Sequence, residues 1–99
     1  MRLTSQQIQT IKTLVSEVFG SDVRVHLFGS RLDDSKKGGD IDLLIQSDQV
    51  IDHKLRKSAS LTARLQLSLG EQKFDVVVKD AQTADTPFYQ EVSRTAAPL

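Results

Sequence analysis

The feature that most limits how this chain can fold is an apolar run that contains two aspartates. The segment 40–45 reads Asp-Ile-Asp-Leu-Leu-Ile, which indicates a buried strand. The alternation of a strand places Asp40 and Asp42 on one face, about 6 to 7 Å apart. Aspartate is depleted from strands, and two buried carboxylates repel each other and lose hydration. The arrangement is therefore favourable chiefly when a cation lies between them.

Hydrophobic periodicity predicts the other elements. They are a helix that ends at Gly20, a strand over 23–28, a helix over 50–69, a strand over 73–78 and a short helix from Thr86-Pro87 to about Thr95. In the first helix, Thr4 and Gln7 are expected to form a capping box. In the 50–69 helix, the expected inner face consists of Ile51, Leu55, Ala59, Thr62, Leu65 and Leu69. The order along the chain is helix, strand, strand, helix, strand, helix.

The composition limits the possible partners. The chain has 99 residues and a mass of 11.0 kDa, which fits one domain over 1–99. Its 13 basic and 13 acidic residues balance, so no positive field would attract a long nucleic acid. The lack of cysteine excludes disulfides, thiolate zinc sites and cysteine nucleophiles. No apolar stretch resembles a signal peptide or a membrane span, and we expect a cytoplasmic protein.

A third aspartate and a glycine-serine pair add to the pattern. Asp75 lies in the apolar third strand, and it would converge with Asp40 and Asp42 if the two strands were neighbours. Hard carboxylate oxygens in this number suit Mg²⁺. Gly29-Ser30 ends the first strand, where glycine lets an oxyanion approach backbone N–H groups and serine adds a hydroxyl donor. Metal ions together with phosphate donors indicate phosphoryl or nucleotidyl transfer.

This combination resembles a known family. The pattern Phe28-Gly29-Ser30, nine intervening residues and Asp40-Ile41-Asp42-Leu43, with Asp75 in a later strand, is similar to that of the DNA polymerase beta-type nucleotidyltransferase superfamily. It is most similar to the stand-alone minimal members. Glycine-serine alone and Asp-x-Asp alone are weak signals, but both at this spacing are specific. The resemblance spans about 23–78, and 87–99 is similar to the short C-terminal helix of minimal members.

The resemblance implies an α/β (α+β) fold with a small mixed β-sheet and helices packed on one side. It implies that Asp40 and Asp42 bind two Mg²⁺ ions, for which Mn²⁺ is a possible substitute. It also implies that Asp75 binds the catalytic ion and helps to deprotonate an acceptor hydroxyl. Gly29 and Ser30 would hold the triphosphate of a nucleoside triphosphate, which we expect to be ATP.

One departure from the family concerns the loop between the two motifs. Many minimal members carry Arg-Gly a few residues after Gly-Ser, whereas this chain has Asp33-Asp34. The loop can therefore take another path. Arg31 is the first choice for a further phosphate contact because it adjoins the motif. Lys36 and Lys37 are either electrostatic helpers or solvated loop charges.

Purely structural explanations stay open for the same residues. Asp40 and Asp42 could belong to an exposed edge strand that follows a hairpin turn. Asp75 could face water from a half-exposed strand. Gly29-Ser30 could be a plain turn at the end of a strand.

The expected function is transfer of a nucleoside monophosphate, AMP, to a hydroxyl on a partner protein or small molecule. Stand-alone minimal nucleotidyltransferases are commonly encoded beside a helical HEPN-type protein and adenylylate a tyrosine of that toxin. The resemblance therefore implies an antitoxin role. Two alternatives stay open: a binding module that neutralises such a partner by contact, and transfer to an antibiotic or other metabolite.

Overall fold

The computed structural model describes residues 3–29, 40–70 and 72–99. Its elements are α1 (Ser5–Phe19), β1 (Arg24–Phe28), β2 (Ile41–Gln46), α2 (Lys54–Leu69), β3 (Phe74–Lys79), α3 (Pro87–Thr95) and β4 (Ala97–Pro98). The first six elements follow the predicted order. β4 is an addition, because two residues are too few to show a hydrophobic period.

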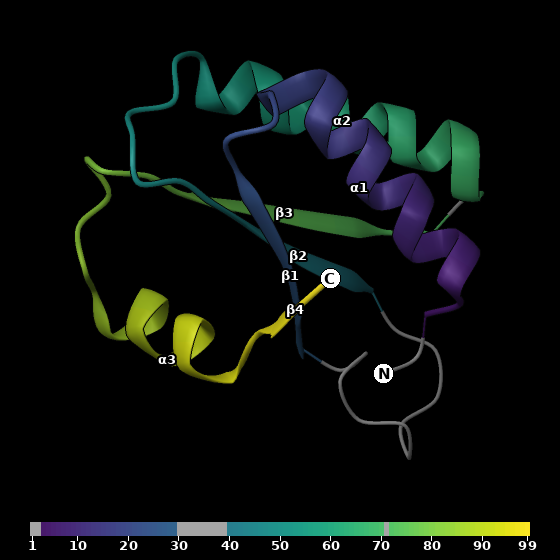
Figure 1. Ribbon diagram of the computed structural model, residues 1–99. Helices are drawn as coiled ribbons and strands as arrows, with labels where there is room; N and C mark the ends of the chain where they lie inside the picture. Colours follow the sequence, from purple (N-terminus) through teal and green to yellow (C-terminus); the bar gives the residue numbers. More distant parts are fainter. Residues whose placement is uncertain (1–2, 30–39, 71) are drawn as a thin grey trace.

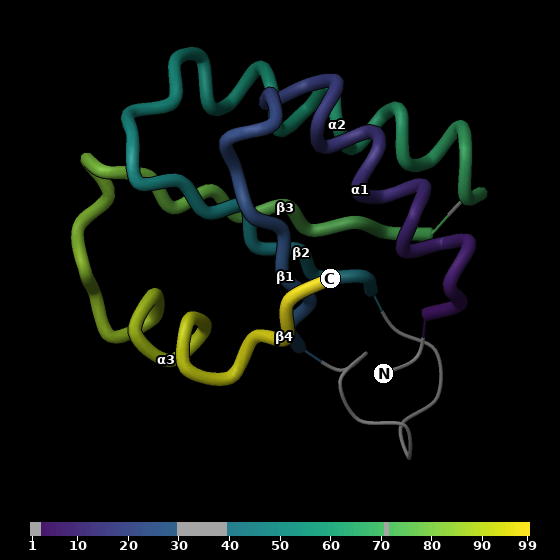
Figure 2. Tube along the Cα trace, in the orientation of Figure 1, coloured from purple at the N-terminus to yellow at the C-terminus, as the bar shows by residue number. Residues whose placement is uncertain are grey.

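The strands form one mixed sheet in the order β3-β2-β1-β4. β2 lies antiparallel to β1 and parallel to β3, and β4 pairs with the other side of β1. Figure 2 follows the return of the chain, which leaves β3, passes through α3 and comes back beside β1. Because β2 has a neighbour on each side, the alternative of an exposed edge strand for Asp40 and Asp42 is wrong.

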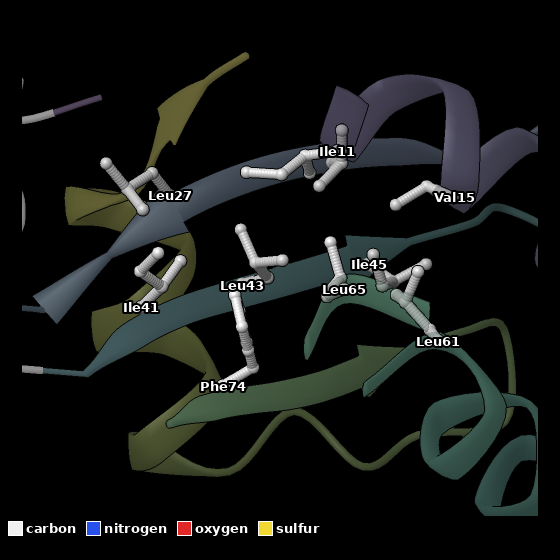
Figure 3. Close-up of a cluster of buried hydrophobic side chains, with 10 residues drawn as sticks. Ile11, Val15, Leu27, Ile41, Leu43, Ile45, Leu61, Leu65 and Phe74 are labelled. Carbon is white, nitrogen blue, oxygen red and sulfur yellow. The ribbon is translucent and has the colours of Figure 1, made fainter. Parts of the chain in front are cut away.

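α1 and α2 cover one face of the sheet as predicted, whereas α3 lies on its other side, so the expectation of helices on one side does not extend to α3 (Figure 1). Figure 3 shows side chains of both helices meeting those of the strands in the main core. This core consists of Ile11, Val15, Val25, Leu27, Ile41, Leu43, Ile45, Leu61, Leu65 and Phe74. Since strand side chains alternate, Asp42 and Asp75 belong to the face away from this core. None of the described helices is long and apolar enough to cross a membrane.

The caps of α1 and α3 form as their residue types predict. Gln7 N–H donates to the Thr4 hydroxyl at 3.0 Å, and Thr4 N–H donates to the Gln7 side chain at 2.9 Å, which completes the capping box. The Thr86 hydroxyl accepts the N–H of Tyr89 at 3.4 Å, and proline occupies the first turn of α3. Both helices therefore start where the sequence predicts.

α2 begins later than predicted and turns a different face inward. His53 has a left-handed backbone, with φ of 55°, so the helix starts only after it. Leu55 was expected inside but is 88% exposed. Leu65 is fully buried as predicted, and Leu61, which lies outside the predicted face, is fully buried as well. The predicted face was aligned on Ile51, which is buried from the preceding loop and does not belong to the helix.

A buried carboxylate joins that loop to the end of β3. Asp80 is 3% exposed, and its side chain accepts the N–H of Ile51 at 2.8 Å and the N–H of Gln82 at 3.0 Å. The Thr83 hydroxyl donates to it at 3.0 Å, and Lys54 Nζ lies 3.0 Å away. These partners, the Ile51 N–H first among them, hold the pKa of Asp80 well below its usual range.

Candidate active site

The register of the sheet places Asp42 beside Asp75. The two residues are Cα partners in the parallel pair of β2 and β3, and Asp42 has Phe28 of β1 as its partner on the other side. Both aspartates are half-buried. The two strands are thus neighbours, as convergence of these carboxylates requires.

The pair of carboxylates attracts positive charge. The pKa of Asp42 is raised to about 6, first by burial and then by a side-chain hydrogen bond with Asp75. The negative charges of Asp75 and Asp40 raise it further, and Lys73 acts in the opposite direction. A hydrogen bond between two carboxyl groups requires a proton on one of them, because carboxylates only accept. A proton or a cation therefore relieves the repulsion at this point of the sheet.

Asp40 and Lys73 precede β2 and β3 at the same end of the sheet. The N–H of Ile41 donates to the carbonyl of Lys73 at 3.0 Å, which joins the starts of the two strands. Lys73 Nζ lies 3.7 Å from Asp40 Oδ2, and the side chains are 70% and 41% exposed. At this exposure the ion pair contributes little to stability. Lys73 is absent from the predicted site, although its position two residues before Asp75 puts it on the same strand face.

Gly29 brings the end of β1 against the carboxylate of Asp42. Its φ of 80° lies in the left-handed region, and a Cβ added there would overlap Oδ2 of Asp42. Glycine is therefore needed at this position for the close approach as well as for the backbone angle. The predicted contact of Gly29 with phosphate stays a prediction.

The remaining residues of the predicted phosphate site lie outside the described residues. They are Ser30, Arg31, Lys36 and Lys37, together with the Asp33-Asp34 pair between them in the sequence. Their phosphate contacts stay predictions.

The carboxylates of Asp40, Asp42 and Asp75 suit a hard cation, but they do not converge into a metal-binding arrangement. Carboxylate oxygens are the ligands that Mg²⁺ prefers. The pKa of Asp42 is raised first by burial and then by the neighbouring Asp75 and Asp40 carboxyl groups. In the described part of the chain, no three His, Cys, Asp or Glu side chains are arranged to hold a metal ion. The Asp40 carboxylate pairs instead with Lys73, and it would have to leave this ammonium group to join Asp42 and Asp75.

A pocket of about 770 Å³ opens at the end of α2, beside this cluster. It is lined by Ala63, Gln66, Leu67, Gln72 and Lys73. Lys73 connects it to Asp40, but none of the three aspartates lines it. We therefore place the candidate site on the face of the sheet that points away from the main core, rather than in this pocket.

The family model for the nucleotidyltransferase domain matches residues 8–93. The chain belongs to this nucleotidyltransferase family. A search of curated proteins finds no match. The span of the nucleotidyltransferase that matches includes Gly29, Ser30 and all three aspartates. The predicted α+β fold with a small mixed sheet is confirmed. Family membership supports nucleotidyl transfer from a nucleoside triphosphate, and the family generally uses divalent metal ions.

Proposed function

We propose that this nucleotidyltransferase transfers AMP from ATP to an acceptor hydroxyl at the aspartate cluster. The observation that carries the proposal is the register of β2 and β3, which sets Asp42 beside Asp75 at the end of the sheet where Asp40 lies. Three carboxylates at one end of a sheet are costly for the fold. In a family that generally uses divalent metal ions, their role as ligands explains that cost.

Asp40, Asp42 and Asp75 would hold two Mg²⁺ ions, with Mn²⁺ as a possible substitute. Bound ions of this kind neutralise the phosphates and the charge that develops on the leaving group. The strands supply the positioning, since β2 and β3 fix two of the carboxylates in register. Gly29 and Ser30 would contact the triphosphate at the end of β1.

The proposed reaction is an in-line displacement at the α-phosphorus of ATP. The acceptor oxygen forms a bond to this phosphorus, the bond from phosphorus to the bridging oxygen breaks, and diphosphate leaves with the electron pair. The proton of the acceptor hydroxyl passes to the carboxylate of Asp75. Asp75 suits this role because it lies on β3, an edge strand of the sheet, where an acceptor can approach.

We further propose that the acceptor belongs to a helical HEPN-type toxin, which gives the nucleotidyltransferase an antitoxin role. Support for this setting comes from the likeness of the Gly29-Ser30 and Asp40-Ile41-Asp42 motifs to those of stand-alone minimal members. A module that neutralises its partner by contact, and an enzyme that modifies a metabolite, predict other outcomes in the experiment below.

The test combines labelled ATP, Mg²⁺ and a purified helical HEPN-type protein, taken from the neighbouring reading frames where one is encoded there. Mass spectrometry then looks for an AMP-sized addition on a hydroxyl side chain. Asp75→Asn should lower transfer by about 10² to 10⁴, because a general base alone is worth that much. It should still bind ATP with Mg²⁺. Asp48→Asn is the matched control, since Asp48 is an 85% exposed carboxylate paired with Arg24, and it should keep full activity. If both wild type and Asp75→Asn inhibit the partner and neither modifies it, the enzymatic proposal fails and the chain acts as a binding module.

A further inference from the structure

The outer edge of β3 offers unpaired backbone groups. The carbonyls of Lys73 and Lys79 each accept a hydrogen bond at 3.0 Å from the segment of β2. Because bonding alternates along a parallel strand, the N–H and C=O groups of Val76 and Val78 point away from β2. β3 is the last strand of the sheet, and no described residue bonds to these outward groups.

A groove of about 450 Å³ runs along this edge. Leu55 and Ser58 of α2 line one side of it, residues 76–78 form its floor, and Phe88 and Tyr89 of α3 line the other side. This fits the placement of α2 and α3 on opposite faces of the sheet (Figure 1). Leu55 is 88% exposed and Phe88 is 53% exposed. An extended peptide suits such a groove, because its backbone pairs with the edge while alternate side chains reach the two apolar walls.

The charges of β3 disfavour pairing with a second copy of the chain in the register centred on Val76. Lys73 and Lys79 lie at the two ends of the strand, on the same face as Asp75. In an antiparallel pair of two β3 strands centred on Val76, each Lys73 would face a Lys79, and like charges directly opposite are destabilising. The groove lining contains no carboxylate among the described residues. The complementary strand therefore has an acidic side chain at each end.

An added strand would also reach the proposed reaction centre. The residue opposite Asp75 on the new strand shares its face of the sheet, with the two Cβ atoms about 5 Å apart. A serine, threonine or tyrosine at that position would present its hydroxyl to the carboxylate of Asp75.

We propose that an extended, acid-flanked segment of the acceptor protein adds to the edge of β3 and presents its hydroxyl to Asp75. The inference deepens the proposed function and rests on it for the chemistry. The docking step itself requires no turnover and is measured separately.

The probe is a labelled synthetic peptide, acetyl-Glu-Val-Val-Val-Ser-Val-Glu-amide. In antiparallel register its glutamates face Lys79 and Lys73, and its serine faces Asp75. Fluorescence anisotropy without nucleotide measures docking. Leu55→Asp should weaken binding at least about tenfold, because it puts a charge on an apolar wall. Leu67→Asp should change it less than about twofold, since Leu67 is equally exposed on α2 but lies outside the groove.

A charge swap supplies an independent measurement. Lys79→Glu should weaken binding of this peptide and strengthen binding of the same peptide with lysines in place of its glutamates. Lys12→Glu carries the same change of charge on α1, an element that does not line the groove, and should do neither.

Three results would overturn the docking site. One is no binding of the peptide to wild-type protein, and another is equal binding to Leu55→Asp and wild type. The third is a dimer in sedimentation that Leu55→Asp dissociates, which would assign the edge to a second copy. Addition of ATP and Mg²⁺ then tests the chemistry. If the peptide binds but its serine is never modified, the docking site stands and the result counts against the proposed function. If AMP is transferred to a partner protein equally well by Leu55→Asp and wild type, the proposed function stands and the docking site is overturned.

Discussion

Replacement of Asp80 by alanine should lower the free energy of unfolding by about 3 kcal/mol. The carboxylate is buried and accepts bonds from the backbone of Ile51 and Gln82, from Thr83 and from Lys54. Loss of the acceptor leaves the N–H of Ile51 buried without its partner, which costs about 1 to 3 kcal/mol. The Lys54 side chain is 36% exposed and can regain water, so the value falls at the lower end of the range for a broken buried pair.

The assay is urea unfolding followed by circular dichroism at pH 7. A loss of about 3 kcal/mol is a large part of the 5 to 15 kcal/mol that stabilises a typical domain, so Asp80→Asn serves as a milder second variant. The matched control is Asp48→Ala, which removes an 85% exposed carboxylate that pairs with Arg24 at 3.1 Å. An exposed pair of this kind contributes little to stability. Equal losses for Asp80→Ala and Asp48→Ala would refute the reasoning.

The same contacts predict a pH dependence. Since the pKa of Asp80 is lowered in the folded state, its contribution is fully present above the unfolded value near 3.8 and is lost as the pH falls toward the folded value. The difference in unfolding free energy between wild type and Asp80→Asn should therefore shrink between pH 7 and pH 3. A constant difference across that range would exclude the charge as its cause.

Four further predictions concern the site and the fold. Gly29→Ala and Gly20→Ala both place a side chain at positive φ, but only at Gly29 would this side chain overlap Asp42. In an assay with labelled ATP, only Gly29→Ala should therefore abolish transfer. Asp42→Asn should lower transfer by at least about 10² yet leave the urea midpoint unchanged or raised, because it relieves carboxylate repulsion; an unfolded variant would contradict this. ATP should bind only with Mg²⁺ in calorimetry, and equal affinity without the ion would count against the metal site. Thr4→Ala should cost about 1 kcal/mol in urea unfolding, since it removes the capping hydroxyl of α1.

Local signals in the sequence predict much of this fold. The starts of α1 and α3 depend on Thr4 and Thr86, whose hydroxyls accept N–H groups three residues away, and such contacts are readable from the chain itself. The buried strand β2 is equally clear, because its apolar run has no helical spacing. Periodicity misjudges α2, since Ile51 belongs to a loop that is held by Asp80 at a distance of 29 residues along the chain.

For the candidate site, the sequence indicates which residues are unusual but not how they lie relative to one another. Asp40, Asp42 and Asp75 attract notice because carboxylates are unusual among apolar strand residues. Their spatial relation depends on the register of β2 and β3, which no local pattern specifies. The pairing of Lys73 with Asp40 follows from that register. The contact between these two side chains therefore could not be predicted from the sequence.

The parallel pairing of β2 and β3 also ties the candidate active site to the order of folding. Parallel neighbours need a crossover, here provided by α2, and contacts between distant segments form slowly because a long loop must close first. A chain in which β1 and β2 have paired while β3 is still free would have Asp42 without Asp75. During refolding, helical content should therefore return before catalytic competence, and the centre would be complete only once the sheet has gained its edge strand.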